Sequence, residues 1–392
     1  MGFKNTVKAA LKKTKVGRSV IAKRNINYYS NQILLKPEEV RKGMESPEKQ
    51  EELVAGQKKK FPEHWKQQND RIDWLVASPL NKKEDLDVLR NRMLFYYFSY
   101  GFTPSEFLAY DLADKTVYEL KEYISDRGSV RYAHRINDTE AIALFFDKNR
   151  TYEVFKTYFC RDAVAIHTAQ DHDSFCDFVK KHPVFVKKDA RESCGRGIEL
   201  VDTTGFSAQE TKVLFDEYVT NGNVILEEKI KQSGELNVIN QSTVNTVRCL
   251  TLVTKHGVIV PWCFGKLGRA GFFIDNGAAG GLLAGIDVQT GTILPDSCCD
   301  EFGNRYKTHP DNGLEIEGFR YPEWDEMIRI CKEMATVVPG ARWIGWDMAH
   351  TEKGWVVVEG NSVTEVIGPQ STLQRGIRKE FDDYLRDVQT VF

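Results

Sequence analysis

Three oxygen-bearing side chains in the segment WIGWDMAHTEKGWVVVEGNS (residues 343–362) have the types and spacing of a cation site. Two apolar halves flank the turn-like TEKG and predict a β-hairpin, in which Asp347 lies opposite Glu359 and Asn361 shares their face. Two carboxylates about 5 Å apart repel each other by roughly 3 kcal/mol at an effective dielectric near 20, so something positive should lie between them. Mg²⁺ suits such a site, since it combines one or two carboxylates with water and phosphate. The alternative is a solvated face, with both carboxylates in water.

A second candidate lies in VFVKKDARESCGRGIELV (residues 184–201), where a predicted strand is followed by a loop. Gly195 and Gly197 would let the backbone present N–H groups to phosphate oxygens, and Lys187 would supply a point charge. The Walker motif GxxxxGK[ST] is absent. A plain hairpin turn is the alternative interpretation.

Further along, the apolar strand in VILEEKIKQSGEL (residues 224–236) ends in acidic residues. Backbone groups after a strand can contact an adenine edge, and a carboxylate can bind ribose hydroxyls. A nucleoside site at Glu227, Glu228, Ile230 and Glu235 is thus one interpretation of the segment, and on these residues alone it is the less favoured one.

Basic residues follow in NTVRCLTLV and FGKLGRAGFFIDN. Arg248 has apolar neighbours in a predicted buried strand, so it needs a partner. With Lys266 and Arg269 from the next strand, it would balance the charge of the two hairpin carboxylates in a site for polyphosphate and metal. Ordinary salt bridges are the alternative.

The elements that must position these residues divide the 392-residue chain into four predicted segments. Residues 1–60 are a basic arm and a charged linker, and residues 61–145 are mainly helical, with Gly101 as a helix stop and Thr103 with Glu106 as a capping box. Residues 146–226 alternate helices and strands. Residues 227–392 contain a strand–turn–strand unit around residues 255–257 and the hairpin, so the predicted class is α+β.

Composition excludes several classes of protein. The net charge of −2, from 54 basic and 56 acidic residues, argues against a nucleic-acid binder. Eight cysteines without a CxxC pair argue against a disulfide framework or a zinc site and favour reduced, cytoplasmic thiols. No apolar run approaches a membrane span, and no signal peptide is visible.

The first 24 residues hold eight Lys or Arg and no acid. We interpret them as an arm that contacts anionic lipid, at the inner face of the membrane, or a polyanionic substrate. A flexible basic tail is the alternative.

In this order the motifs resemble the ATP-grasp fold, and most closely the sugar-transfer-associated ATP-grasp family. The resemblance covers roughly residues 85–375 and rests on YGFTPSEFLAYDL, FFDKNRTYEVF, NTVRCLTLV, the RAG…IDNGAAGG run and WDMAHTEKGWVVVEGN. It implies two α+β subdomains that clasp ATP, a lid and a C-terminal subdomain, preceded by a mainly helical region.

The resemblance also implies a role for each candidate residue. Lys148 and Lys187 would contact the α- and β-phosphates beneath a loop that includes Ser193, Gly195 and Gly197. The adenine and ribose would lie against Glu227, Glu228, Ile230 and Glu235, and two Mg²⁺ ions (or Mn²⁺) would be held by Asp347, Glu359 and Asn361. Arg248 would stabilise the transferring phosphoryl group, helped at the acceptor by Lys266 or Arg269. Asp275 and Asn276 would orient the acceptor, and the N–H groups of Gly280 and Gly281 would contact an acyl oxygen. One departure is Lys188, which stands where many relatives have proline.

The implied activity is that of an ATP-dependent carboxylate–amine ligase, in which a carboxylate becomes an acyl phosphate that an amine attacks. The family's association with surface sugars implies a sugar carboxylate joined to an amine or amino acid, or an acid joined to an amino sugar, in bacterial capsule or lipopolysaccharide synthesis. A sugar kinase and a non-catalytic ATP-binding scaffold are the alternatives.

Overall fold

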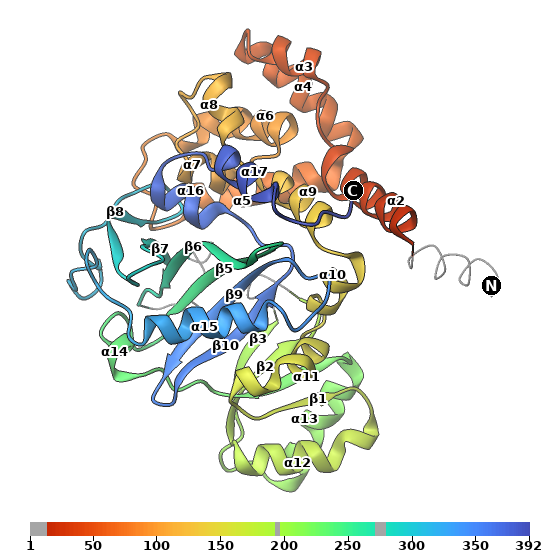
Figure 1. Cartoon of the computed structure of the whole chain (residues 1–392), viewed down its shortest axis with the longest axis vertical. Helices are drawn as coiled ribbons and strands as arrows, with labels where there is room; N and C mark the ends of the chain where they lie inside the picture. The colour runs from red at the N-terminus through yellow and green to blue at the C-terminus, as the bar shows by residue number, and fades with distance from the viewer. Residues whose placement is uncertain (1–13, 193–196, 271–279) are drawn as a thin grey trace, which may run out of the picture.

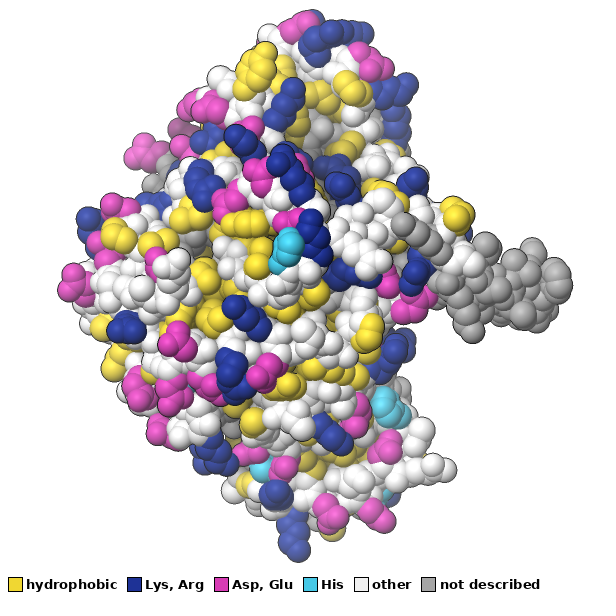
Figure 2. Space-filling view, viewed as in Figure 1, with side chains coloured by type: hydrophobic (Ala, Val, Ile, Leu, Met, Phe, Trp, Pro, Cys, Tyr) yellow, Lys and Arg dark blue, Asp and Glu magenta, His cyan; other side chains and the backbone are white. Residues whose placement is uncertain are grey.

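The computed structural model describes residues 14–192, 197–270 and 280–392, and it shows helices arranged around two antiparallel sheets. A helical part lies at the top of Figure 1, the larger sheet in the middle and the smaller sheet at the bottom. The predicted α+β class is thereby confirmed. Charged side chains of both signs are interspersed over the face drawn in Figure 2, in keeping with the nearly neutral chain.

The helical part is built around α6, whose aromatic side chains, from Phe95 to Phe98, are almost fully buried. The predicted helix stop and capping box are both present: Gly101 adopts a left-handed conformation, and the Thr103 side chain caps a helix whose Glu106 bonds back to the cap. The helices of this part are α2 (Lys15–Ile26), η1 (Asn27–Asn31), α3 (Pro37–Gly43), α4 (Pro47–Lys60), α5 (Pro62–Ala77), η2 (Leu86–Leu89), α6 (Arg90–Tyr100), α7 (Pro104–Ala109), α8 (Val117–Glu122) and α9 (Asp126–Ile136).

The many charges of residues 36–60 favour an exposed helix or a linker, and the structure shows helices whose side chains are mostly exposed. These helices are α3 and α4, and α4 packs against α6 with Val54 and Gln57 buried. Gln57 also donates a hydrogen bond of 2.7 Å to the Ile33 carbonyl. One narrow stripe of buried residues therefore holds an otherwise exposed and charged helix against α6.

The smaller sheet has the order β1-β4-β2-β3, with every pair antiparallel. Helices α12 and α13 cover one of its faces through Phe175, Phe215 and Tyr218, which pack against Phe185 and Leu226. The elements from the linking helices through this sheet are α10 (Thr139–Phe145), α11 (Lys148–Phe159), β1 (Ala163–Ile166), η3 (Ala169–Asp171), α12 (His172–Lys181), β2 (Val184–Asp189), β3 (Ile198–Asp202), α13 (Ala208–Asn221) and β4 (Val224–Glu228).

The larger sheet has the order β10-β9-β5-β6-β7-β8. Its strands are β5 (Thr246–Thr254), β6 (Gly257–Leu267), β7 (Leu282–Ile286), β8 (Ile293–Cys299), β9 (Trp343–Thr351) and β10 (Gly354–Asn361), and the short helix α14 (Gly234–Asn237) precedes them. The expected strand–turn–strand unit is therefore β5 and β6, with its turn at Lys255 and His256.

The two faces of the larger sheet have different coverings. Helix α15 (Trp324–Met334) packs on one face together with Phe155 of α11, against Trp346 and Cys249. On the other face, α16 (Ile367–Leu373) lies over β6–β8, and α17 (Arg378–Leu385) packs on Trp262 and Trp343 at one end. The strand residues Arg248, Lys266, Asp347 and Glu359, discussed below, lie on this second face. Among the described residues, no helix combines the length and apolar character that a membrane span requires.

Candidate active site

The hairpin of β9 and β10 has the expected register. Glu359 lies opposite Asp347, and the pairing shifts by one residue between Val357 and Glu359, where a β-bulge brings the two carboxylates level. The Asn361 Nδ2 donates to Glu359 Oε1 at 3.4 Å, so Asn361 shares their face.

The positive charge between these carboxylates comes from the protein itself. The Arg248 guanidinium makes a two-pronged ion pair with Asp347, through Nε to Oδ1 and through Nη2 to Oδ2 at 2.8 Å. The Lys266 Nζ donates to the same Oδ2 at 2.9 Å. The expected metal therefore does not fit at Asp347 in this arrangement, because both carboxylate oxygens already bind cations.

These contacts fix the charges of the buried groups. Burial by itself raises the pKa of Asp347, but Arg248 and then Lys266 outweigh it and hold that pKa well below the ordinary range. Burial likewise lowers the pKa of Arg248, and Asp347 more than reverses this effect. The pair is thus ionised across the pH range in which proteins function, and Asp347 fixes the orientation of both cations.

Glu359 and Asn361 remain as oxygen donors that fit Mg²⁺. Among the described residues, no cation forms an ion pair with Glu359, and both side chains are half-buried. A carboxylate and an amide oxygen side by side are a suitable partial ligand set for a hard cation that keeps several waters.

The predicted lysine Lys148 lies beside Glu359. Burial lowers the pKa of Lys148, while the Glu359 charge opposes this shift and the Lys188 charge adds to it, so the three groups are neighbours. The Lys148 Nζ donates to the Asp189 carbonyl at 3.1 Å and also to the Glu192 carbonyl, so the lysine is anchored to the end of β2 and the loop that follows.

The structure places the second predicted lysine, Lys187, away from this group. Lys187 pairs in register with Leu226 and Glu199, and so it shares the face of the smaller sheet that α12 and α13 cover. Its Nζ forms ion pairs with Asp189 at 3.1 Å and Glu199 at 3.2 Å. Because side chains alternate along a strand, Lys188 points to the opposite face.

Lys188 lies on the face that carries Glu227. Its Nζ donates to Glu227 Oε2 at 2.8 Å, and the Arg161 guanidinium binds the same oxygen through Nε at 3.0 Å and Nη2 at 2.5 Å. Burial raises the pKa of Glu227, but Arg161 and Lys188 outweigh it and lower the pKa to about 2. Glu227 was expected to contact the ribose. Its carboxylate is instead bound by two cations of the protein and is not free.

Arg161 also joins the two sheets. Its Nη1 donates to the Val357 carbonyl at 2.6 Å and its Nη2 to the Val358 carbonyl at 3.3 Å, at the bulge of β10. The side chain therefore ties β4 of the smaller sheet to β10 of the larger one. We call the resulting group the inter-sheet site; its members are Lys148, Arg161, Lys188, Glu227, Arg248, Lys266, Asp347, Glu359 and Asn361.

Of the other predicted nucleoside residues, Glu228 and Glu235 lie outside this group. The Glu228 Oε2 accepts a hydrogen bond of 3.2 Å from the Asp162 N–H, in a cluster with His182 whose ligand atoms lie within 4.8 Å of one another. Asp162 is already paired with Lys181 at 2.5 Å and His182 at 2.7 Å, so its carboxylate has partners within the protein. Ile230 is half-buried.

Glu235 lies at the turn end of the hairpin, because the preceding Gln232 bridges to Thr351. Thr351 is four residues along β9 from Asp347, a distance of about 13 Å at the usual rise per residue. Glu235 is thus placed away from the paired carboxylates.

Among the predicted acceptor residues, Arg269 binds Asp311, with Nε 3.0 Å from both carboxylate oxygens, and does not reach Asp347. Gly280 and Gly281 are buried at the start of β7, which pairs with β6 so that Leu283 lies opposite Lys266. Gly197 has a positive φ of 67° and packs against Asp189. Ser193, Gly195, Asp275 and Asn276 lie outside the described residues.

Two functional candidates escaped the sequence interpretation. The sequence interpretation treats Lys188 only as a replacement for proline, although its orientation could have been predicted. Side chains alternate along a strand, so Lys187 lies on the same face as the large, buried Phe185, and Lys188 lies on the opposite face. Arg161 carried no such signal, since its partners Glu227 and Val357 lie 66 and 196 residues away.

A protein-family model described as sugar-transfer-associated ATP-grasp matches residues 127–386. No curated protein matches the chain. Similar solved structures include an N5-carboxyaminoimidazole synthase from Aspergillus clavatus, with a TM-score of 0.37 and 10% identity over 63% of this chain and 54% of that one. The ATP-grasp ligase PsnB has a TM-score of 0.39 and 12% identity over 67% and 69%. A D-alanine–D-alanine ligase from Coxiella burnetii has a TM-score of 0.39 and 9% identity over 65% and 60%. The aligned part spans only about half of the first of these chains.

Proposed function

Because the chain belongs to the sugar-transfer-associated ATP-grasp family, we propose that it is an ATP-dependent ligase that joins a carboxylate to an amine. The observation that carries this proposal is the charge of the inter-sheet site. Five cations (Lys148, Arg161, Lys188, Arg248 and Lys266) lie with four carboxylates (Glu227, Asp347, Glu359 and Glu365, the last of which interacts with Arg248 and Lys266), so a small excess of positive charge remains between the two sheets. Such an excess suits the phosphates of ATP.

Seven members of the site have a proposed role in the reaction. Lys148 and Lys188 contact the phosphates from the side of the smaller sheet, and Glu359 and Asn361 hold Mg²⁺, or Mn²⁺ in its place. The metal, when bound, would offset the negative charge of the phosphate oxygens. Arg248 and Lys266, held in place by Asp347, stabilise the charge on the phosphoryl group as it transfers.

The acceptor side of the reaction is proposed at the start of β7. The backbone of Gly280 and Gly281 lies at the end of the strand that pairs with β6 beside Lys266, and it would contact the acyl oxygen of the activated carboxylate. The amine then attacks the acyl phosphate and releases phosphate. We propose a sugar carboxylate joined to an amine or amino acid, or an acid joined to an amino sugar, in surface polysaccharide synthesis.

The test is ADP release from the full chain with ATP, Mg²⁺ and hydroxylamine, over a panel of uronic acids and amino acids. We expect ADP together with a hydroxamate, because hydroxylamine traps an acyl phosphate, and the hydroxamate identifies the carboxylate. ADP with a phosphorylated sugar and no hydroxamate would favour the kinase alternative. ATP binding without ADP release across the panel would favour the non-catalytic scaffold.

The contact of residues 1–24 with anionic lipid or a polyanionic substrate, at the inner face of the membrane, stays a prediction. In the described part of this segment, Val16 and Val20 are exposed on α2 while Ala22 and Ile26 pack inward. Lys23 and Arg24 are exposed in the next turn of the same helix. An apolar pair beside basic residues is compatible with a lipid surface.

A further inference from the structure

A pocket of about 370 Å³ lies in the helical part, away from both sheets. Its apolar walls include Tyr100, Phe102 and Tyr123, from the region of α6 and the end of α8, and Arg378 of α17 closes one side. Tyr123 is almost fully buried and stacks on Tyr110 with ring centroids 5.1 Å apart, so this wall is rigid. Phe102 and Tyr123 expose little surface, so the ring that a ligand would contact is the half-buried Tyr100, and an aromatic ring is a suitable surface for a ring-shaped ligand.

Three cations line this pocket without a carboxylate partner. Across residues 14–192, 197–270 and 280–392, no ion pair to an acid is formed by Lys121, Arg131 or Arg378. Burial lowers the pKa of Arg131, and the neighbouring Arg378 charge lowers it further, so the two guanidinium groups repel each other. An anion in the pocket would relieve this repulsion.

The position of Arg378 is fixed by the pocket wall. Its Nε donates to the Lys121 carbonyl at 2.5 Å and its Nη2 to the Tyr123 carbonyl at 2.6 Å. These bonds hold the charge at the pocket without neutralising it, because backbone carbonyls carry no net charge. Among the residues that the structure describes, the hydrogen-bond partner of Arg131 is the Asn31 Oδ1, at 3.4 Å.

A second and independent feature points to a ligand. Ser99 lines the same pocket and is 8% exposed, and its hydroxyl has no hydrogen-bond partner within the part of the chain that the structure describes. A buried hydroxyl without a partner is costly, and a ligand hydroxyl or phosphate oxygen would satisfy it.

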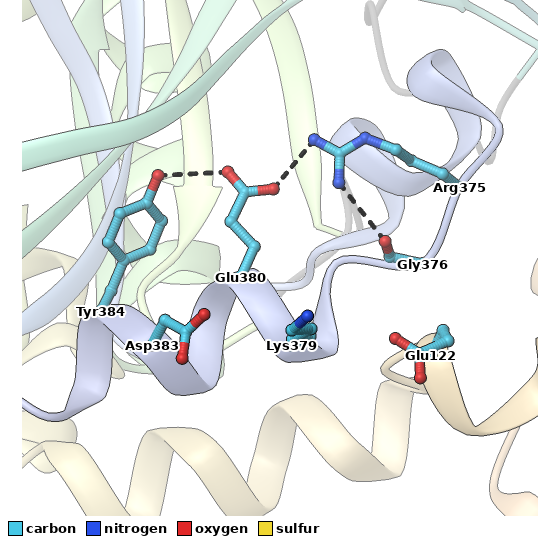
Figure 3. A pocket seen from close by; sticks show the side chains of 7 residues that line it. All are labelled: Glu122, Arg375, Gly376, Lys379, Glu380, Asp383 and Tyr384. Atoms are coloured by element: carbon cyan, nitrogen blue, oxygen red, sulfur yellow. Dashed lines mark hydrogen bonds and ion pairs between the residues drawn. The ribbon is translucent and has the colours of Figure 1, made fainter.

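The pocket drawn in Figure 3 is a useful comparison, because it is lined by both basic and acidic side chains of the protein. It lies on the adjoining surface of α17, where Arg375 and Lys379 face Glu122, Glu380 and Asp383. The Arg375 Nη2 pairs with Glu380 at 2.8 Å, and the Tyr384 hydroxyl donates to the same carboxylate at 3.1 Å. This pocket is lined by three carboxylates beside its two cations, and Arg375 is ion-paired, whereas no carboxylate among the described residues lines the pocket beside Tyr123.

We propose that the pocket between α6, α8, α9 and α17 binds a sugar ring that carries a negative charge, such as a sugar phosphate or a uronic acid. The aromatic wall contacts the ring, Lys121, Arg131 and Arg378 bind the anionic group, and the Ser99 hydroxyl bonds a ring hydroxyl or anion oxygen. This site is separate from the inter-sheet site, since none of its lining residues belongs to either sheet.

Titration calorimetry on the full chain tests the proposal, with glucose 6-phosphate and glucuronate as probes. We expect at least one probe to bind with a Kd below about 1 mM, and neutral glucose and inorganic phosphate to bind at least tenfold more weakly. Saturation with ADP and Mg²⁺ should leave this binding unchanged, because the nucleotide occupies the other site.

The variants Lys121→Gln and Ser99→Ala should each weaken that binding about fivefold. Both should fold: Lys121 is exposed, and Ser99→Ala removes an unpaired buried hydroxyl, so its melting temperature without ligand should equal or exceed that of the wild type. Lys379→Gln is the matched control, since it removes one positive charge from the same helix as Arg378 but from the pocket drawn in Figure 3. The proposal is overturned if neither probe binds, if phosphate or glucose binds as tightly, if ADP displaces the probe, or if the three variants bind alike.

Discussion

Two neighbouring lysines illustrate how a single residue step decides function. Lys187 and Lys188 are adjacent in the sequence, but the strand alternation sends Lys187 toward α13 and Lys188 toward Lys148 and Glu359. Lys187 forms ion pairs with Asp189 and Glu199, while Lys188 and Arg161 both bind the Glu227 carboxylate. Only Lys188 is thus on the side of the inter-sheet site.

We therefore expect Lys188→Met to lower kcat/KM for ATP by about 100-fold, because it removes a fixed positive charge from the phosphate site. Lys187→Met is the matched control and should stay within about threefold of the wild type, since its ion pairs are with carboxylates on the helix-covered face. Steady-state ADP release measures both. The opposite order would restore the original assignment of Lys187.

At the scale of elements, β10 positions the site through a bulge and a glycine. The bulge at Val358 lets Glu359 oppose Asp347, and Gly360 lies against the rings of Phe145 and Trp346 on the sheet's other face. A Cβ at Gly360 would approach both rings to 2.8 Å. Packing therefore requires a glycine at position 360. Because it has no side chain, the rings of Phe145 and Trp346 can lie directly against the strand that carries Glu359.

Gly360→Ala should lower the free energy of unfolding by about 1–3 kcal/mol, because two buried rings must shift to make room. Gly56→Ala is the control in an open position: a Cβ there meets nothing within 4 Å, so alanine in the interior of α4 should stabilise the chain by about 0.4–1 kcal/mol. Chemical denaturation measures both changes. Equal effects of the two variants would contradict the packing argument.

At the scale of the whole molecule, the two sheets are joined by a buried ionic group that doubles as part of the site. Arg161 contacts Glu227 of β4 and the carbonyls of β10, and Lys188 completes the arrangement. Since Glu227 has a pKa of about 2 in the folded chain, against 4.5 ordinarily, its ionised form stabilises the fold. This contribution is present above about pH 4.5 and is lost as the pH falls toward 2.

The pH dependence gives a test on stability alone. The difference in unfolding free energy between the wild type and Glu227→Gln should shrink by roughly 3 kcal/mol between pH 4.5 and pH 2, because protonation removes the ion pairs from the wild type as well. Exposed Glu153→Gln serves as control and should stay within about 0.5 kcal/mol of the wild type throughout. A constant difference for Glu227→Gln would mean that its charge does not hold the sheets together.

What lay close together along the chain could be predicted from the sequence. The hairpin register of Asp347 and Glu359, the strand–turn–strand unit of β5 and β6, and the Thr103 capping box all depend on contacts within a few residues of a turn or helix end. The family motifs could be recognised for the same reason, since each is a short run of residues. Local geometry and hydrophobic periodicity are written directly in the order of the side chains.

Only the tertiary structure decided which charged side chains form ion pairs with each other. The sequence predicted that Arg248, Lys266 and Arg269 would balance the hairpin carboxylates, but not that Arg248 and Lys266 would both bind Asp347 while Arg269 binds Asp311. Arg248 and Lys266 come from strands 99 and 81 residues away, and the sheet order that brings them together is a property of the whole fold. The same holds for Lys188, Arg161 and Glu227, whose face depends on how α12 and α13 cover the smaller sheet. Ion pairs depend on distance in space, and that distance is set by the packing of elements that are remote in sequence.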